Sequence, residues 1–228
     1  IEVGYAELTG LQKHILQVAR KHDRVTITAT QMMESMIQSP VPTRAEVSDV
    51  ANAVLDGSDA VMLSGESAVG KYPVRAVEAM SEVIVGAEKY QIARNIRGER
   101  FEGRVSEFAQ AIAHAVMYTA NHMAVEAIVA LTESGATPLW MSRIRSDIPI
   151  FAFTRSERTR RRVALYRGVY PIPFDITHTD PAELYKAISR ELIERNFLRS
   201  GDEIILTLGE FSGVSGGTNT MKLLEVNA

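Results

Sequence analysis

The chain contains no cysteine, which excludes disulfide bonds, thiolate metal sites and cysteine nucleophiles. It has no apolar run of transmembrane length and no pattern typical of a signal peptide. Its net charge of -3 gives no general reason to expect nucleic acid or a membrane surface as a partner. These absences predict a cytoplasmic protein that binds neither nucleic acid nor membrane.

The remaining composition is that of a globular protein. Hydrophobic residues make up 46% of the 228 residues, enough for one large domain or two modest ones. The chain opens with Ile1-Glu2-Val3-Gly4, without an initiator methionine or a polar leader. We expect it to be a piece of a longer protein, the alternative being a processed or tagged chain.

The first ninety residues alternate between helical and strand patterns, which predicts α/β wiring. Predicted helices cover about 5–22, 43–56 and 73–89, and predicted strands cover 25–29 and 60–63. Thr43 followed by Glu46 has the spacing of a capping box at the start of the second helix. Ala60–Leu63 is wholly apolar, which is typical of a strand buried on both faces of a parallel sheet.

Residues 91–104, "QIARNIRGERFEGR", are charged and poor in apolar side chains, which predicts a linker. Beyond it the alternation resumes and predicts an open, mostly parallel sheet with helices on both faces. The predicted helices are 105–122, 138–146, 156–166 and 181–197, and the predicted strands are 127–131, 149–154, 169–174 and 203–208. A last strand, 220–226, is expected at the edge of the sheet.

Polar clusters follow both strands of the first half, at Thr28–Gln31 and at Ser64–Ser67. Ligands of α/β folds bind at the carboxyl ends of strands. Hydroxyls there can donate to an anion, and the next helix N-terminus adds positive potential. The alternative is that these hydroxyls cap helices or satisfy loop backbone.

The stretch 30–73, "TQMMESMIQSPVPTRAEVSDVANAVLDGSDAVMLSGESAVGKYP", closely resembles pyruvate kinase. The chain beyond it, through Thr218–Met221, is similar to the C-terminal domain of that family. The resemblance implies an α/β protein in which residues 1–97 form the last two βα units of a (β/α)8 TIM barrel, with a linker. Residues 98–228 would then form the open, mostly parallel α/β C-terminal domain.

The resemblance also implies a glycolytic transferase that moves a phosphoryl group from phosphoenolpyruvate to ADP, giving pyruvate and ATP, with Mg2+ and K+. Thr30 would bind substrate near its carboxylate, and Ser64 would lie near the site of enolate protonation. The family's metal ligands, catalytic lysine and monovalent-cation site would all precede Ile1. We therefore expect no metal ligand in this chain and no activity of the chain alone. The parent would be a homotetramer, with Arg44 near a barrel interface.

A second candidate site follows the predicted strand 127–131. Hydroxyls and a glycine before a helix N-terminus make a phosphate cradle, although they can equally serve as simple helix caps. The resemblance implies an allosteric sugar-phosphate or nucleotide effector bound by Thr132, Ser134, Gly135 and Thr137. In the family, an arginine is common at the position of Ala136, and another effector-binding arginine occurs in some members in the region of Ser212. The resemblance therefore does not identify the effector.

Two further interpretations remain open. The chain could be a noncatalytic effector-binding module of a truncated pyruvate kinase, which regulates by binding or by joining full-length subunits. Five arginines between Arg155 and Arg162 lack interleaved aromatics, which favours a solvated or subunit-facing surface over nucleic-acid binding.

The 1–90 segment, with two open strand edges, is expected to be stable only with the missing barrel or against the second domain.

Overall fold

A computed structural model describes residues 4–93, 105, 107–175, 181–209 and 217–227. The chain divides into two compact units, residues 1–96 and 97–228. Each unit has its own sheet and its own core. Within the described residues, no helix is both long enough and apolar enough to span a membrane.

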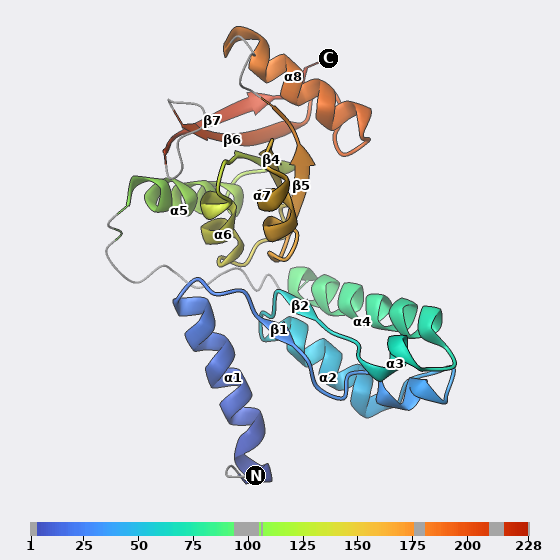
Figure 1. The fold of residues 1–228 in the computed structure, drawn as a ribbon. Helices are drawn as coiled ribbons and strands as arrows, with labels where there is room; N and C mark the ends of the chain where they lie inside the picture. The colour runs from blue at the N-terminus through green and yellow to red at the C-terminus, as the bar shows by residue number, and fades with distance from the viewer. Residues whose placement is uncertain (1–3, 94–104, 106, 176–180, 210–216, 228) are drawn as a thin grey trace. The chain divides into compact units, whose positions relative to one another are not determined.

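The first unit contains two βα repeats behind an N-terminal helix (Figure 1). Its elements are α1 (Tyr5–Lys21), β1 (Ile27–Thr28), η1 (Glu34–Ile37), α2 (Arg44–Leu55), β2 (Ala60–Val61), α3 (Gly65–Ala68) and α4 (Pro73–Ala93). The two strands are parallel, with Ile27 opposite Ala60 and Thr28 opposite Val61. The backbone N–H of Met62 extends the ladder by donating to the Thr28 carbonyl at 3.1 Å.

Three methionines form the centre of this unit's core. Met32, Met33 and Met36 are fully buried and pack with side chains of α2 and α4, namely Val50, Ala53, Ala76 and Met80. Unbranched methionine side chains fill irregular gaps well. The segment between β1 and α2 is therefore anchored to both helices, although it is mostly irregular.

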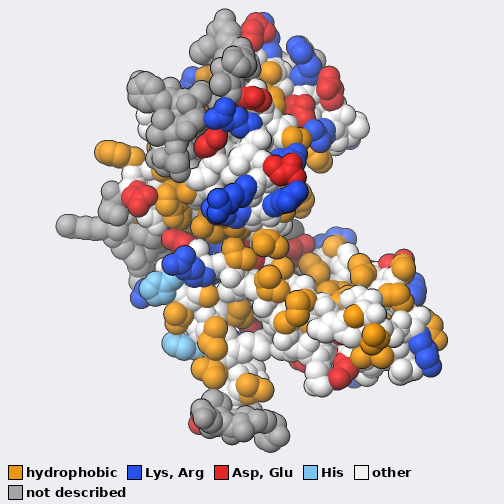
Figure 2. All heavy atoms as spheres, viewed as in Figure 1, with side chains coloured by type: hydrophobic (Ala, Val, Ile, Leu, Met, Phe, Trp, Pro, Cys, Tyr) orange, Lys and Arg blue, Asp and Glu red, His pale blue; other side chains and the backbone are white. Residues whose placement is uncertain are grey.

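Both strands of this unit are shorter than predicted, and the prediction that 60–63 is buried on both faces is wrong. Ala60 and Val61 are half-buried, and Ile27 and Met62 are 51% and 46% exposed. Within the described part of unit 1 the sheet has two strands, so too few neighbours cover it. Helix α1 also exposes apolar side chains, namely Leu8, Leu11, Ile15 and Val18, and hydrophobic side chains are visible along that helix in Figure 2.

The second unit is an open five-stranded sheet with the order β5-β4-β3-β6-β7. Its elements are α5 (Phe108–Ala120), β3 (Ala127–Leu131), α6 (Ala136–Ser142), β4 (Ile150–Thr154), α7 (Glu157–Val163), β5 (Val169–Pro173), α8 (Pro181–Glu194), β6 (Glu203–Gly209) and β7 (Thr218–Glu225). All neighbours are parallel except β7, which runs antiparallel to β6 at the edge. Helices α5, α6 and α7 lie on one face and α8 lies on the other (Figure 1).

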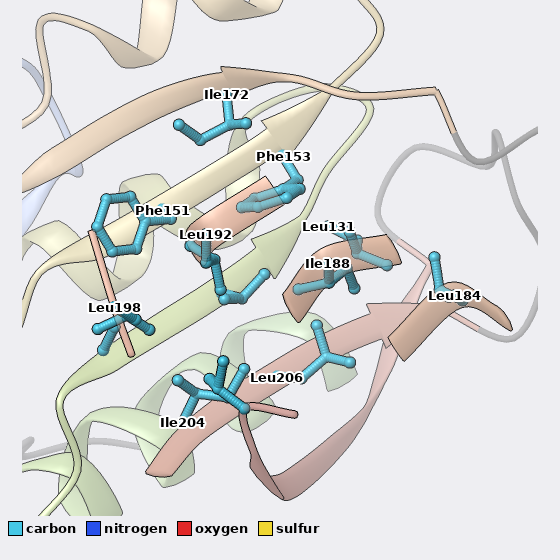
Figure 3. Close-up of a cluster of buried hydrophobic side chains, with 13 residues drawn as sticks. Leu131, Phe151, Phe153, Ile172, Leu184, Ile188, Leu192, Leu198, Ile204 and Leu206 are labelled. Carbon is cyan, nitrogen blue, oxygen red and sulfur yellow. The ribbon is translucent and has the colours of Figure 1, made fainter. Parts of the chain in front are cut away.

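The main core of this unit lies between the sheet and α8. Leu184, Ile188 and Leu192 form an apolar stripe on α8 and belong to the same buried cluster as Phe153 and Leu206 on the strands (Figure 3). Several helix boundaries differ from the prediction: α6 covers 136–142 instead of 138–146, and α7 and α8 end at 163 and 194 instead of 166 and 197. In the predicted linker, residues 91–93 still belong to α4, and the rest, 94–104, lies outside the described residues.

Candidate functional site

The polar clusters after β1 and β2 end up at one edge of the small sheet. Because the strands are parallel and in register, their carboxyl ends face the same way. Thr30 and Ser64 come shortly after these ends, and both are exposed. The Thr30 hydroxyl makes a weak contact to the Met32 Sδ atom at 3.5 Å. Two exposed hydroxyls are thus carried by neighbouring loops.

Thr28, the first hydroxyl of the cluster, has a structural role. Its side chain is 7% exposed, and its Oγ1 atom lies 2.6 Å from the Oγ atom of Ser58. A buried hydroxyl without a partner would cost free energy, so this pair stabilises the start of β2 against β1. The outward-facing part of the cluster therefore begins after Thr28.

Glu66 connects the loops that follow the two strands. Its Oε1 atom accepts a hydrogen bond from the backbone N–H of Met33 at 3.0 Å, and its Oε2 atom accepts one from the N–H of Ser64 at 2.7 Å. The residue is 3% exposed. Glu66 lies inside the predicted polar cluster Ser64–Ser67, but the sequence pattern alone gives it no role. The available signal was an acidic side chain among small polar residues directly after a predicted strand.

A second connection lies farther along the same loops. The backbone N–H of Lys71 donates to the carbonyl of Ile37 at 2.9 Å. A Cβ atom on Gly65 would lie 3.0 Å from the Ile37 Cδ1 atom, so the start of α3 fits closely against η1. The two loops are therefore joined at both ends of α3.

Glu46 fixes the other end of the first loop. Its carboxylate accepts hydrogen bonds from the backbone N–H and the hydroxyl of Ser35, both at 2.6 Å. It accepts two more from Thr43, at 2.7 and 2.8 Å, within the predicted capping box, which is confirmed. Burial raises the pKa of Glu46, but the hydrogen bonds from Ser35 and Thr43 outweigh it and hold the pKa below its usual value. The ionised form is thus the one that fits.

In the second unit, the loop after β3 is ordered by its own hydroxyls. Thr132 Oγ1 accepts from the Gly135 N–H at 2.9 Å, and Ser134 Oγ accepts from the Ala136 N–H at 3.4 Å. Gly135 has φ of 82°, and a Cβ atom there would lie 2.7 Å from the Val163 Cγ1 atom. Only glycine suits this turn, because both the backbone and the space exclude a side chain.

The four predicted effector residues have different surroundings. Thr132 and Ser134 are half-buried, and both can still donate a hydroxyl proton. Thr137 is 3% exposed, and its Oγ1 atom lies 2.8 Å from the Oγ1 atom of Thr218 on β7. The role of Ser212 lies outside the described residues. Thr137 therefore fixes α6 to the sheet edge, and the loop before it presents the accessible hydroxyls.

The arginine run lies on and just before α7, beside this loop, and basic side chains gather over α7 in Figure 2. Arg162 Nη1 donates to the Ser134 carbonyl at 3.4 Å. The neighbouring carboxylates are paired as well: Arg155 contacts Glu133 at 3.3 Å, and Arg160 and Arg161 contact Glu157 at 3.0 and 2.6 Å. The hydrogen bond and charge of Arg161 hold the pKa of Glu157 below its usual value.

The described residues contain no group of three or more histidine and carboxylate side chains able to hold a metal ion. Side chains that would fit Mg2+ are thus not gathered at either candidate site. Hydroxyls, backbone amides and one buried carboxylate are what the strand ends offer. The hydroxyls and backbone amides among these groups can donate hydrogen bonds to an anion, whereas the carboxylate can only accept them.

Fold and sites together define an α/β protein that joins an unclosed pair of barrel-type βα units to a mostly parallel open-sheet domain. The family model for the pyruvate kinase barrel domain matches residues 1–77, and the model for the pyruvate kinase alpha/beta domain matches residues 110–224. The chain belongs to the pyruvate kinase family.

Curated relatives agree along almost the whole chain. Pyruvate kinase of Buchnera aphidicola subsp. Baizongia pistaciae is 48% identical over 99% of this chain and 47% of its own length. Pyruvate kinase II of Salmonella typhimurium is 49% identical over 99% of this chain and 47% of its own length. The protein from Haemophilus influenzae is 49% identical over 92% and 44%. The chain thus spans about half the length of the curated relatives it matches.

Proposed function

We propose that this chain is the part of a pyruvate kinase that supplies Thr30 and Ser64 to phosphoryl transfer from phosphoenolpyruvate to ADP, giving pyruvate and ATP in glycolysis. Thr30 would donate to the substrate near its carboxylate, and Ser64 would lie near the carbon that is protonated. The observation that carries the proposal is the pair of exposed hydroxyls on neighbouring loops after two parallel strands, inside the segment matched by the barrel-domain model.

The proposal includes a longer polypeptide as the active form. Phosphoryl transfer depends on positioning and on charge stabilisation by metal ions and a cationic side chain. We propose that Mg2+, K+ and the catalytic lysine are provided by residues equivalent to the first half of the relatives. The 228 residues alone are then expected to turn over no phosphoenolpyruvate.

A fused chain tests this directly. Residues 1–228 would be joined behind the upstream half of the Salmonella typhimurium pyruvate kinase II, and pyruvate formation from phosphoenolpyruvate and ADP would be measured with Mg2+ and K+. We expect turnover by the fused chain and none by the 228 residues alone. A well-folded but inactive fused chain would contradict the proposal, and activity of the 228 residues alone would contradict the need for a longer polypeptide.

The role of Thr30 has its own test in the fused chain. A hydrogen bond to a charged group is worth roughly 1.5–3 kcal/mol, so Thr30→Val should weaken phosphoenolpyruvate binding about ten- to a hundredfold. The control variant changes the exposed Thr9 of α1. Thr43 is not suitable as a control, because it caps α2. Thr9→Val should leave the KM for phosphoenolpyruvate unchanged, and an equal KM for Thr30→Val would remove Thr30 from the site.

A second candidate function is effector binding by unit 2, either within the enzyme or as a noncatalytic regulatory module. The loop 132–137 is already ordered by hydrogen bonds, and its accessible hydroxyls lie beside Arg162. We propose that Thr132, Ser134 and the backbone around Gly135 take the phosphate of a sugar phosphate or a nucleotide, with Thr137 holding the start of α6.

Calorimetry with ribose 5-phosphate, fructose 1,6-bisphosphate and AMP, each added to the 228-residue chain, separates these cases. Saturable binding that is lost in Ser134→Ala supports the site. Saturable binding by the chain together with an inactive fused chain favours the regulatory module. No binding of any of the three to a folded unit 2 would argue against this use of the loop.

A cytoplasmic location and a homotetrameric parent, with Arg44 near the barrel interface, belong to the same proposal.

A further inference from the structure

Glu66 is a buried carboxylate that lies between the two loops carrying Thr30 and Ser64. Each of its oxygens accepts from a different loop, Oε1 from the Met33 N–H at 3.0 Å and Oε2 from the Ser64 N–H at 2.7 Å. In the part of the chain that the structure describes, no cation pairs with Glu66, so backbone amides are its partners. Glu66 is 3% exposed, so water has little access to its carboxylate.

We propose that Glu66 is a positioning residue, which sets the spacing of Thr30 and Ser64 by holding the backbones of both loops. The inference rests on the proposed function, because this spacing matters for turnover only if both hydroxyls meet one substrate. Glu66 itself would not touch the substrate, since both of its oxygens are occupied by backbone donors inside the fold.

The need for such a connection follows from where the sheet ends. In the described residues, the last backbone hydrogen bond between the two strands joins the Met62 N–H to the Thr28 carbonyl. Thr30 and Ser64 lie beyond that point, where sheet pairing no longer fixes their distance. Beyond the strands, the Glu66 carboxylate joins the two loops, because it accepts from Met33 on the first and from Ser64 on the second. An error of about 1 Å in the position of a reacting group can reduce the rate about a hundredfold.

The test is Glu66→Gln in the fused chain. Glutamine keeps the shape but turns an NH2 group toward one of the two N–H donors, so one connection is lost. We expect kcat/KM to fall about ten- to a hundredfold, and amide exchange to increase in peptides covering 31–37 and 62–67. Glu34→Gln is the matched control, because Glu34 is exposed in the same loop and should change neither measurement.

A double variant distinguishes positioning from a general loss of stability. If Glu66 acts through Ser64, Glu66→Gln should reduce kcat/KM by less than about threefold further in a Ser64→Ala background, because the group to be positioned is gone. Equal losses in both backgrounds would overturn the positioning role. Unchanged amide exchange would overturn the connection itself, whether or not the fused chain is active. An inactive wild-type fused chain would reject the proposed function separately.

Discussion

At the scale of single residues, Glu46 links stability to pH. Its folded pKa lies below the usual glutamate value of 4.5, so the ionised carboxylate favours the folded state. This stabilisation is complete above 4.5 and is lost as the pH falls through the lower folded pKa. Glu46→Gln should therefore cost about 1–3 kcal/mol near neutral pH, and the difference from wild type should shrink in acid.

Urea unfolding followed by far-UV circular dichroism at several pH values measures this difference. Glu34→Gln serves as the control for the loss of one negative charge, because this exposed glutamate lies in the neighbouring η1 helix, and it should not reproduce the loss of stability that Glu46→Gln causes near neutral pH. A difference between wild type and Glu46→Gln that stays constant from neutral to acid pH would show that the charge of Glu46 has no structural role.

Gly135 and Gly168 differ in why a side chain is unfavourable at each position. Both have positive φ, 82° and 70°, but a Cβ atom on Gly135 would lie 2.7 Å from the Val163 Cγ1 atom, whereas Gly168 has open space. Gly168→Ala should cost about 1–2 kcal/mol for backbone strain, and Gly135→Ala should cost about 1–3 kcal/mol more for overpacking. The single tryptophan, Trp140, lies in α6 of the same unit, so its fluorescence in urea measures both. Equal losses would mean that Val163 moves at no cost.

At the scale of elements, one buried hydrogen bond joins α6 to the edge strand β7. Thr137 and Thr218 share it at 2.8 Å. Thr137→Val or Thr218→Val leaves the other hydroxyl buried and unpaired, so each should cost about 1–3 kcal/mol, and the double variant should cost less than their sum. Thr207→Val is the control, since its buried Oγ1 atom has no hydrogen-bond partner among the described residues. Additive losses in Trp140-monitored unfolding would contradict the coupling.

Elements with local signals were predicted well from the sequence. The Thr43–Glu46 capping box is confirmed because its spacing lies within one turn, and β3 has the predicted limits, 127–131, because its apolar run has polar neighbours. The helices η1 and α3 were missed, because each is a single short turn without periodicity.

The candidate sites were predictable only in part. The position of Thr30 and Ser64 after two parallel strands followed from the pattern, whereas their roles in catalysis stay predictions. Glu66 bonds to Met33 across 33 positions, and Thr137 bonds to Thr218 across 81. No local rule connects residues at such separations, so these contacts required the structure.

At the scale of the whole molecule, the two units differ in how well each buries its apolar side chains. The main core cluster of unit 2 has 13 buried residues (Figure 3). The cluster of unit 1 is smaller, and its first helix exposes Leu8 and Ile15 by 55% and 56%. Exposed apolar surface contributes little to folding, so unit 1 should be the less stable of the two.

This difference predicts that the 228-residue chain does not unfold in one step. Far-UV circular dichroism reports both units, whereas Trp140 reports unit 2. The dichroism should therefore begin to fall at a lower urea concentration than the Trp140 signal. Met36→Ala should shift the early change and Ile188→Ala the late one. Each substitution should lower the free energy of unfolding of its own unit by about 2–5 kcal/mol, because both side chains are fully buried. Coincident transitions that both variants shift alike would mean that the units fold as one.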